Sequence, residues 1–484
     1  MPLESGTELH DLTITDLTVQ GQSIARHDGR VLFLDQGLPG EVVDARVIDI
    51  RKKTVFCEVT HITQYSPNRV SPWCPHFGDC GACMWQHCTL KAQREWKHRH
   101  VTQTLARIGK VTDIVVHPVA ASPLSRAYRN KMAFAFGASS DEEGCAIGLR
   151  LHRGHALVEV TQCGIIPEAA NQVVGFVRNW LNADDGDSET ASPAAGSGSL
   201  AGYLRFLVVR VPDYAPEGKR AVHVECITGT NHRALFGKTQ DDAAAGGRKG
   251  GTTNRDKVME LANLLCSKHK LADGFVHSER KSTADVAQGE RVIATFEKPF
   301  AKEAFDGCVL SCVPHDAFLQ TNTSVATLLY RRVAEEAGLG GTEVLWDLYC
   351  GVGSIALYLA GQTKEAHGFE VNPNAVKAAR KNAAALGMSN CHFHTGALGK
   401  TSLSGIAAPD CIVLDPPRAG LDEGVAEMLL SLPARKLLYV SCDAATLARD
   451  CTRLASRWTP TACYPFDMFP NTPHVETLTV FTPR

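Results

Sequence analysis

The sequence predicts an α/β protein in three parts: a small β-barrel at the amino end, a β-rich middle, and a C-terminal open parallel sheet with crossover helices. Over residues 9–62, apolar and polar residues alternate in short stretches separated by glycines, which is typical of strands in a small barrel. After residue 318, helical and strand patterns alternate. A chain of 484 residues also exceeds what one hydrophobic core supports. We therefore expect domains at 1–63, 64–310 and 311–484.

The composition is that of an ordinary globular protein, with 44% apolar and 21% charged residues. The first residues lack the pattern of a signal peptide, and no long apolar run is present, so we expect a location in the cytoplasm or an organellar matrix. We also expect the protein to be a monomer. The net charge of −2 gives no global sign of nucleic-acid binding. One stretch, 91–131, carries nine Lys or Arg against two acids, which indicates a nucleic-acid surface or a solvated helix face.

Two segments in the middle of the chain are small, polar and rich in glycine. They cover 182–199 and 240–254. Such composition gives too little apolar surface to pack, so we expect both to be flexible surface insertions. Between them, Tyr203–Val211 and Ala221–Thr228 are predicted strands.

A glycine turn follows the first strand of the C-terminal part, in the sequence EVLWDLYCGVGS over 343–354. Glycines there let a ligand approach the backbone at the carboxyl end of the strand. A second strand, Ala366–Phe369, ends in Glu370, where a carboxylate can accept both hydroxyls of a ribose. Because only one glycine pair is present, we predict a nucleoside cofactor rather than a dinucleotide.

A later strand over 410–415 ends in Asp415, which two prolines follow. The prolines end the strand and hold the carboxylate rigidly at the edge of the sheet. The alternative is an aspartate that only caps a helix.

The next strand, Lys436–Ser441, ends in Cys442, which would face the same crevice as the cofactor. Cys350, beside the glycine turn, is the competing candidate for a nucleophile, but the turn that follows it has to wrap the cofactor. His474 and Glu476 lie before the last strand, and either is a candidate general base or a turn residue.

One chemistry needs this combination of groups. Carbon 5 of uracil is too weak a nucleophile to take a methyl group directly from a sulfonium. Addition of a thiolate at carbon 6 makes carbon 5 reactive, and a base then removes the carbon 5 proton so that the thiol can leave. Cys442, Asp415 and Glu476 are the candidates for the thiolate, the carboxylate beside the ring and the base.

At these residues the chain resembles the RNA uracil-5 methyltransferase family, and the resemblance runs through nearly the whole chain. It implies an α/β architecture with a Rossmann-like C-terminal domain that binds S-adenosylmethionine, and it identifies 9–62 as similar to a TRAM domain, an OB-like barrel that binds RNA. The matching stretches are FLQTN (318–322), DLYCGVGSIAL (347–357), LDPPRAG (414–420), SCDAATLARD (441–450) and FPNTPHVETLTV (469–480).

The resemblance also implies roles for individual residues. Cys442 is the nucleophile and Glu476 the base. Gln320 and Asp415 hold the uracil or lie beside the cofactor. The remaining matched residues would contact S-adenosylmethionine, and they are Tyr349, Ser354 and Glu370.

The chain departs from the family pattern in two places. Asp443-Ala444 stand where the family commonly has Asn-Pro after the nucleophile. Gly396-Ala397 stand where a polar side chain often meets the adenine, so that contact would come from the backbone.

Three cysteines lie close together with the spacing C-x5-C-x2-C, at Cys74, Cys80 and Cys83, and Cys163 follows at a distance. Close cysteines separated by glycines indicate a metal site, which suits zinc and an iron–sulfur cluster equally. The resemblance to the ribosomal-RNA branch of the family implies a [4Fe–4S] cluster on these four, in a central iron–sulfur domain. Cys88 has no matched position, and no disulfide is expected.

By the same resemblance, the TRAM-like domain together with the cluster implies large-subunit (23S) ribosomal RNA as the substrate rather than transfer RNA. Three alternatives stay open: a transfer-RNA uracil-5 methyltransferase, a methyltransferase of another base such as cytosine, and a catalytically idle RNA-binding or maturation factor. The last rests only on the Asp443-Ala444 departure.

Overall fold

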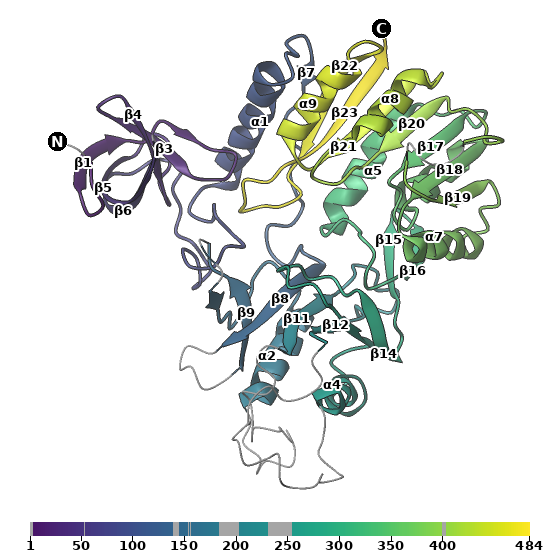
Figure 1. Cartoon of the computed structure of the whole chain (residues 1–484), viewed down its shortest axis with the longest axis horizontal. Helices are drawn as coiled ribbons and strands as arrows, with labels where there is room; N and C mark the ends of the chain where they lie inside the picture. Colours follow the sequence, from purple (N-terminus) through teal and green to yellow (C-terminus); the bar gives the residue numbers. More distant parts are fainter. Residues whose placement is uncertain are drawn as a thin grey trace, which may run out of the picture.

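The computed structural model describes residues 3–52, 54–138, 145–152, 154, 156–182, 203–230, 254–398 and 403–484. Both predicted insertions, 182–199 and 240–254, lie almost wholly outside the described residues. Figure 1 shows three parts: an N-terminal group of strands at one end, a C-terminal sheet with helices on both faces, and a central sheet below. None of the described helices combines the length and apolarity that a membrane span needs.

The N-terminal strands form one six-stranded sheet in the order β1-β5-β6-β4-β3-β2. The predicted alternation is confirmed, because every second residue of the central strand β5 (Val43, Ala45 and Val47) is buried in the core of this part. Asp28 and Gly29 both adopt positive φ, as a two-residue hairpin turn between β3 and β4 requires. The strands are β1 (Glu8–Thr13), β2 (Asp16–Leu17), β3 (Ser23–His27), β4 (Arg30–Leu34), β5 (Val42–Arg51) and β6 (Thr54–Gln64).

The central part is a seven-stranded sheet in the order β10-β9-β8-β11-β12-β13-β14. Both strands predicted in this part are confirmed, as β11 and β12. The helices α2 and α4 share a buried apolar core with the sheet. The elements are β8 (Lys131–Ala138), β9 (Cys145–Arg150), β10 (Leu157–Val158), α2 (Glu168–Asn182), β11 (Leu204–Arg210), β12 (His223–Thr228), α4 (Asn254–Asn263), the π-helical turn η2 (Leu264–Lys268), β13 (Gly274–Glu279) and β14 (Arg291–Glu297).

The C-terminal part contains the predicted parallel sheet with crossover helices. Its order is β19-β18-β17-β20-β21-β23-β22-β7, with β23 antiparallel to β21. The elements are α5 (Thr323–Ala337), β17 (Val344–Leu348), α6 (Ser354–Leu359), η3 (Ala360–Gln362), β18 (Glu365–Glu370), α7 (Pro373–Ala385), β19 (Cys391–Thr395), β20 (Cys411–Leu414), α8 (Glu423–Ser431), β21 (Lys436–Ser441), α9 (Ala444–Leu454), β22 (Trp458–Phe466) and β23 (Glu476–Pro483).

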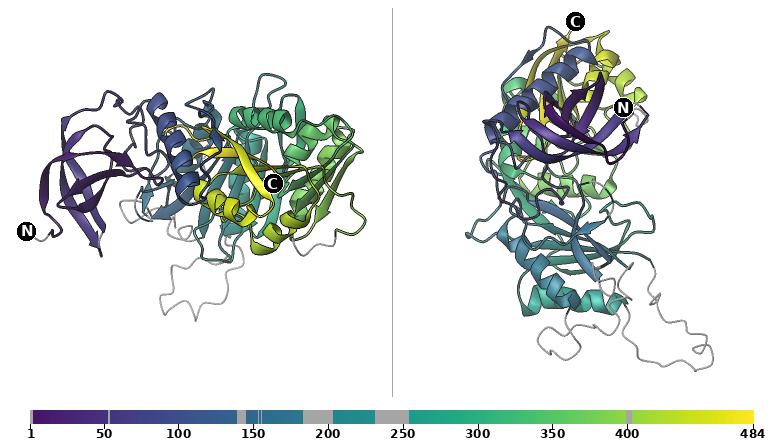
Figure 2. Two further views of the ribbon diagram at one scale, coloured as in Figure 1. Left: turned by 90° about the horizontal axis from the view of Figure 1, so that it is seen from above. Right: turned by 90° about the vertical axis from the view of Figure 1, so that its left-hand side faces the viewer.

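Residues from the first third of the chain complete this sheet. The short strand β7 (Val115–Val116) pairs with β22 at its edge, and helix α1 (Leu90–Arg107) packs against α9. Figures 1 and 2 show α1 beside the C-terminal helices and next to the N-terminal strands. Residues 90–116 therefore connect the N-terminal part directly to the C-terminal sheet. A hairpin of β15 (Ala301–Phe305) and β16 (Cys308–Val313) packs on α5 between the central and C-terminal parts.

Candidate active site

The predicted nucleophile and the predicted base lie side by side at one edge of the C-terminal sheet. Strands β21 and β23 pair so that Ser441 lies opposite Thr477. The next residue outward on each strand is Cys442 and Glu476, respectively. Asp415 follows the parallel neighbour β20, and its amide donates to the carbonyl of Leu348 on β17 over 3.3 Å. The sheet register thus brings the three predicted catalytic residues to one place.

The charges around Cys442 oppose its ionisation. Burial raises the pKa of this thiol to about 11, and the neighbouring carboxylates of Glu476 and Asp415 act in the same direction. Arg418 acts in the opposite direction and favours the thiolate. In the free protein Cys442 is therefore a thiol at neutral pH. Among these neighbours, only Arg418 lowers the pKa of the thiol.

The two carboxyl groups also resist ionisation. Glu476 is 2% exposed, and burial raises its pKa well above the usual value, with repulsion from Asp415 as the next cause. Burial raises the pKa of Asp415 to about 7. The Oε1 atom of Glu476 is buried and has no hydrogen-bond partner among the described residues. A buried carboxyl with a free oxygen and a raised pKa is suited to accept a proton from a bound substrate.

Arg418 is a candidate site residue that the sequence reasoning did not single out. It is exposed and lies in the turn after Asp415, and it lowers the pKa of both Cys442 and Glu476. It stands within the LDPPRAG stretch, so its position four residues after the strand was the available signal. An arginine here stabilises whichever of the two neighbours is anionic.

Gln320 is placed where it holds Asp415. Its Nε2 donates to Asp415 Oδ2 over 3.1 Å, and its side chain is 4% exposed. The backbone around Gln320 is fixed in turn by Asn130. The side-chain Nδ2 of Asn130 donates to the Gln320 carbonyl over 3.1 Å, and its backbone N–H donates to the Thr321 carbonyl over 2.7 Å. The central part of the chain therefore positions an active-site residue of the C-terminal part.

The glycine turn after β17 is tied to the acid that ends β18. The amide of Gly351 donates to Glu370 Oε2 over 3.1 Å, and that of Asn372 donates to Oε1 over 2.8 Å. Gly353 has φ +82 and lies so close to the Phe393 ring that a Cβ atom would be 2.8 Å from it. Tyr349 also adopts a positive φ, of 64, which starts the turn. The predicted arrangement of turn and acid is thus present, with Tyr349 and Glu370 on its two sides.

Asp347 is a second residue that the sequence reasoning passed over as a site residue. It is 1% exposed, its Oδ2 accepts from the Ala356 amide over 2.9 Å, and its buried Oδ1 has no partner among the described residues. Burial raises its pKa to about 8. Ser354 begins the helix that follows, and its hydroxyl accepts from Tyr330 over 3.0 Å. A buried acid with a free oxygen beside a glycine turn is suited to a cationic or hydroxyl-bearing ligand.

The two competing candidates are placed differently. Cys350 is 5% exposed and belongs to the apolar core of the C-terminal part, against Gly368 of the neighbouring strand. His474 is exposed, and its ring meets the edge of Phe469. Of the candidates, Cys442 and Glu476 are therefore the pair that the sheet register brings together.

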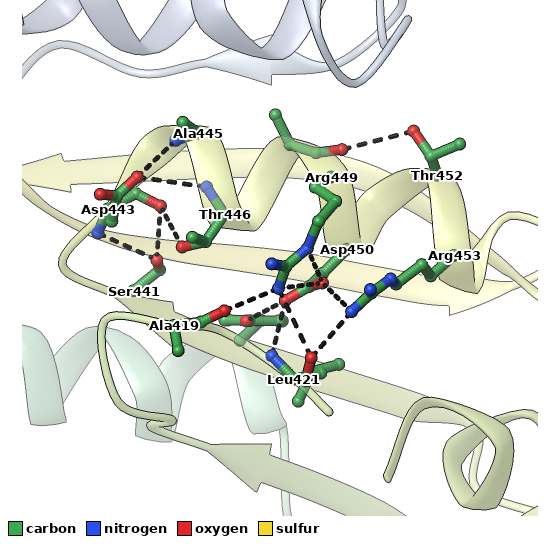
Figure 3. Close-up of polar contacts among 12 residues, drawn as sticks. Ala419, Leu421, Ser441, Asp443, Ala445, Thr446, Arg449, Asp450, Thr452 and Arg453 are labelled. Carbon is green, nitrogen blue, oxygen red and sulfur yellow. Dashed lines mark hydrogen bonds and ion pairs between the residues drawn. The ribbon is translucent and has the colours of Figure 1, made fainter. Parts of the chain in front are cut away.

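The loop after Cys442 is fixed although it lacks the Asn-Pro pair. The Asp443 side chain caps α9 by accepting from the amides of Ala445 and Thr446, over 2.8 and 3.1 Å, and the Ser441 hydroxyl bridges the Asp443 backbone (Figure 3). An N-terminal cap of this kind needs only a side-chain oxygen, which Asp supplies as well as Asn.

A second set of contacts joins α9 to the turn that carries Arg418. Asp450 is 0% exposed and accepts from the Leu421 amide and the Tyr439 hydroxyl, each over 2.8 Å. Arg449 pairs with Asp450 and donates to the Ala419 carbonyl over 2.8 Å (Figure 3). Helix α9, which follows Cys442, is therefore tied at the buried Asp450 to the turn after Asp415.

Comparison with known proteins agrees with this geometry. Residues 309–483 match the family described as tRNA (Uracil-5-)-methyltransferase, and residues 6–60 match the TRAM domain. An RNA methyltransferase of Nitratidesulfovibrio vulgaris is 38% identical over 98% of this chain and 95% of its own. The chain belongs to the RNA uracil-5 methyltransferase family. A second relative, from Halalkalibacterium halodurans and also named an RNA methyltransferase, is 30% identical over 97% of this chain and 96% of its own.

The family fold is also seen in a solved structure. The tRNA (uracil-54, C5)-methyltransferase of Pyrococcus abyssi, in complex with S-adenosyl-L-homocysteine, matches 98% of this chain and 99% of its own length. The TM-score is 0.71 at 23% identity. The predicted α/β architecture with an N-terminal TRAM domain and a Rossmann-like C-terminal domain is thus confirmed.

The four cysteines predicted to bind a metal all line one cavity in the central part. Cys74, Cys80, Cys83 and Cys163 share its wall with apolar side chains that include Trp73. Burial raises the pKa of Cys83 to about 12 and that of Cys163 to about 11, and the other cysteines add to both. Within the described part of the chain, however, no group of three or more His, Cys, Asp or Glu is spaced to hold a metal ion. The structure therefore shows a common cavity but not a formed ligand set.

Cys88 does not belong to this cavity. It is 3% exposed and packs in a separate apolar cluster with Leu17 and Trp85. It is thus a core residue, whereas its lack of a matched position left both a core and a surface place open.

Proposed function

We propose that this protein methylates carbon 5 of a uracil in large-subunit ribosomal RNA, with S-adenosylmethionine as methyl donor and Cys442 as covalent nucleophile. The observation that carries the proposal is the register of β21 and β23, which places Cys442 and Glu476 side by side next to Asp415. A methyltransferase acting on an exocyclic amine needs no cysteine and no second base at this position.

The residues of this chain act in a defined order in the proposed reaction. The Cys442 thiolate adds to carbon 6 of the uracil, and the ring becomes an enolate. Carbon 5 of this enolate takes the methyl group as the bond between that group and the sulfonium sulfur breaks, so that S-adenosylhomocysteine leaves. Glu476 then removes the proton from carbon 5, the electron pair of that bond re-forms the double bond, and the carbon–sulfur bond breaks to release the thiolate. Asp415, held by Gln320, lies beside the ring, where a carboxyl group can hydrogen bond to it.

The raised pKa values give each group a proton that it can exchange. Burial raises the pKa of Glu476 and of Cys442, and each is raised further by negative charge nearby. Arg418 is the positive neighbour that lowers the pKa of Cys442, and it therefore favours the thiolate. Because Asp415 and Glu476 repel each other, one proton is readily held between the two carboxyl groups.

The residues around the glycine turn fit S-adenosylmethionine. Glu370 can accept from the ribose hydroxyls, since a carboxylate that already binds two amides retains free lone pairs. Asp347, with its unpartnered Oδ1, offers an acceptor near the turn. Val371 and Phe318, 66% and 65% exposed, provide apolar surface beside these acids for the adenine or the uracil. Tyr349 and Ser354 lie at the start and end of the turn. When bound, S-adenosylmethionine supplies the electrophilic methyl group.

Two arginine–aromatic pairs are suited to unpaired RNA, and one of them includes a residue of the loop that leads to Glu476. Arg129 lies over Phe469, and Arg126 lies over Trp73, at 5.7 and 4.4 Å from the ring centroids. Exposed arginines and aromatic faces are the groups that bind phosphates and bases of single strands. Together with the TRAM domain they support RNA as the substrate, and the target uracil has to leave its stack to reach Cys442.

The cavity lined by Cys74, Cys80, Cys83 and Cys163 offers four thiols as donors for a [4Fe–4S] cluster, and His76 and Gln86 are the polar side chains on its otherwise apolar wall. Burial raises the pKa of Cys80, Cys83 and Cys163, so these thiols would be neutral without a metal, and binding of a cluster would release their protons. Such a cluster would join the segment 74–83 to Cys163. The four-cysteine pattern resembles that of the ribosomal-RNA branch of the family, and this resemblance supports ribosomal RNA over transfer RNA as the substrate.

Transfer RNA is the second candidate substrate, since the Pyrococcus abyssi enzyme, which matches over the full length, is named for it. The test is to incubate the protein with S-adenosylmethionine and either ribosomal RNA or transfer RNA from cells that lack the gene. We expect 5-methyluridine, measured by mass spectrometry of nucleosides, in the ribosomal RNA with wild-type protein and none with Cys442→Ser. Product only in transfer RNA would contradict the ribosomal assignment, and 5-methylcytidine would contradict the uracil assignment.

The cluster is tested separately by metal analysis of protein purified without oxygen. We expect about four irons and four labile sulfides per chain, lost in the Cys83→Ser variant. Stoichiometric zinc in place of iron would contradict the cluster.

A further inference from the structure

The loop that joins β22 to Glu476 is held by helix α1, which comes from a distant part of the chain. The loop spans 467–474, and its Asp467 and Asn471 are only 1% and 4% exposed. Two side chains of α1, Gln93 and Lys97, reach this loop, and both are 0% exposed. Neither residue contacts the predicted cofactor turn, so the reaction as described gives them no task.

Gln93 connects the loop to the cysteine-bearing segment. Its Oε1 accepts from the Asn471 amide over 2.8 Å. Its Nε2 donates to the carbonyls of Trp85 and Cys88, each over 2.8 Å. The amide of Trp85 also donates to the Asn471 carbonyl over 2.9 Å. One buried side-chain amide therefore fixes both the backbone before Glu476 and the segment that follows the metal-site cysteines.

Lys97 fixes the start of the same loop. Its Nζ lies 2.5 Å from Asp467 Oδ1 and donates to the Phe469 carbonyl over 3.0 Å. Burial lowers the pKa of Lys97, while Asp467 acts in the opposite direction. A fully buried ion pair contributes little net stability compared with apolar residues of the same size. The effect of the Lys97–Asp467 pair is instead geometric, because the pair and the contact with the Phe469 carbonyl together fix the position of the loop.

The backbone of the loop is held in an uncommon conformation. Asn471 has φ 67, in the left-handed region, where a residue other than glycine persists only when its surroundings hold it. Tyr128 adds a further constraint by donating to the Pro470 carbonyl over 3.1 Å. The loop then runs through Pro473, which lies against Gly21 of the TRAM part, to Glu476.

We propose that Gln93 and Lys97 are positioning residues for the base: by fixing residues 467–471 they set Glu476 where its carboxylate meets the hydrogen on carbon 5. The inference rests on the proposed function, because it assigns these residues to the proton-removal step of that reaction. It concerns that step alone. Addition of Cys442 to carbon 6 and transfer of the methyl group precede it.

The experiment compares proton removal with adduct formation in the full-length protein. Turnover is measured on RNA whose target uridine carries hydrogen or deuterium at carbon 5, and the rate of covalent adduct formation is measured on the same RNA with 5-fluorouridine. The fluorine blocks proton removal, so the adduct reports only the earlier steps. The variants are Gln93→Leu and, for the ion pair, the double variant Lys97→Met/Asp467→Asn, which leaves no buried charge unpaired. Gln103→Leu, on the same helix, is the matched control.

For Gln93→Leu we expect turnover to fall at least about tenfold, the ratio of the rates with hydrogen and deuterium to rise above that of the wild type, and the adduct to form at a rate within about twofold of the wild type. The double variant should behave alike, and Gln103→Leu should match the wild type. Adduct rate and turnover falling together, or an unchanged isotope ratio, would overturn the inference, because a general loss of structure affects both steps. A wild-type protein that forms no adduct would instead overturn the proposed function.

Discussion

The side-chain amide of Gln320 donates to Asp415 Oδ2 over 3.1 Å, and this bond joins the segment before α5 to the end of β20. This contact lowers the pKa of Asp415 against the larger raising effect of burial. Through this hydrogen bond, the segment that leads out of the central part positions the carboxyl group of Asp415.

Replacing Gln320 by leucine removes this contact at nearly constant volume. A hydrogen bond to an ionisable group contributes about 1.5–3 kcal/mol, so the single-turnover methylation rate should fall about 10- to 100-fold. Rapid-quench measurement of 5-methyluridine gives the rate, with Gln362→Leu at an exposed position as control. A rate equal to the wild type would show that Asp415 needs no partner.

The thiol of Cys442 should react slowly at neutral pH, because burial and the nearby Glu476 raise its pKa to about 11. The thiolate fraction, and with it the rate of alkylation of this residue, then rises about tenfold per pH unit between pH 7 and 9.5. Peptide mass spectrometry resolves Cys442 from the other 16 cysteines.

Arg418 lowers the same pKa, so Arg418→Met should slow the alkylation of Cys442 about tenfold at each pH without changing the slope. An alkylation rate that levels off near pH 7 in the wild type would mean that the thiolate is already formed, which contradicts the charge balance described above.

Glu476→Gln removes the base but leaves the earlier steps intact. Turnover should fall by about 10²- to 10⁴-fold, and a methylated covalent complex with ordinary RNA should accumulate and survive denaturing electrophoresis. In the wild type, the raised pKa of Glu476 means that turnover should increase as the pH rises, because the ionised form becomes available only then. Rapid turnover without an accumulated complex in the variant would assign the base elsewhere.

The Asp443 cap tests the departure from the Asn-Pro pattern. Asp443→Ala loses two hydrogen bonds at the start of α9 and should lower the free energy of unfolding by about 1 kcal/mol, seen as a fall in Tm of about 2–4 °C. The double variant Asp443→Asn/Ala444→Pro should keep both Tm and methylation, because Ala444 is the first residue of the helix, where proline is tolerated. A marked gain in activity by the double variant would show that the natural Asp-Ala pair weakens the site.

Much of the fold followed from local patterns. The alternation in the TRAM part, the strands around β11 and β12, and the helix–strand order after residue 318 are each set by residues near one another in the chain. The same holds for the placement of Cys442 and Asp415 at strand ends. The motif order brought them to one edge of the sheet, since parallel strands share their carboxyl ends.

Other features depend on contacts between distant residues, which local patterns do not encode. Lys97 was counted in a basic stretch, but it is fully buried against Asp467, 370 residues away. Helix α1 and β7 pack on the C-terminal sheet although the strands of the central sheet, β8 to β14, lie between them and that sheet in the chain. Arg418 and Asp347 gained their roles only from the charges and the unpaired oxygen that the fold places around them.

The proposed reaction depends above all on Cys442 being the covalent nucleophile. Wild-type protein should be incubated with S-adenosylmethionine and RNA that carries 5-fluorouridine at the target site, and the covalent complex digested and mapped by mass spectrometry. We predict one modified peptide, with the methylated fluorouridine attached to Cys442, and no complex with Cys442→Ala. Attachment at Cys350 or any other cysteine, or a complex that persists in Cys442→Ala, would contradict the account.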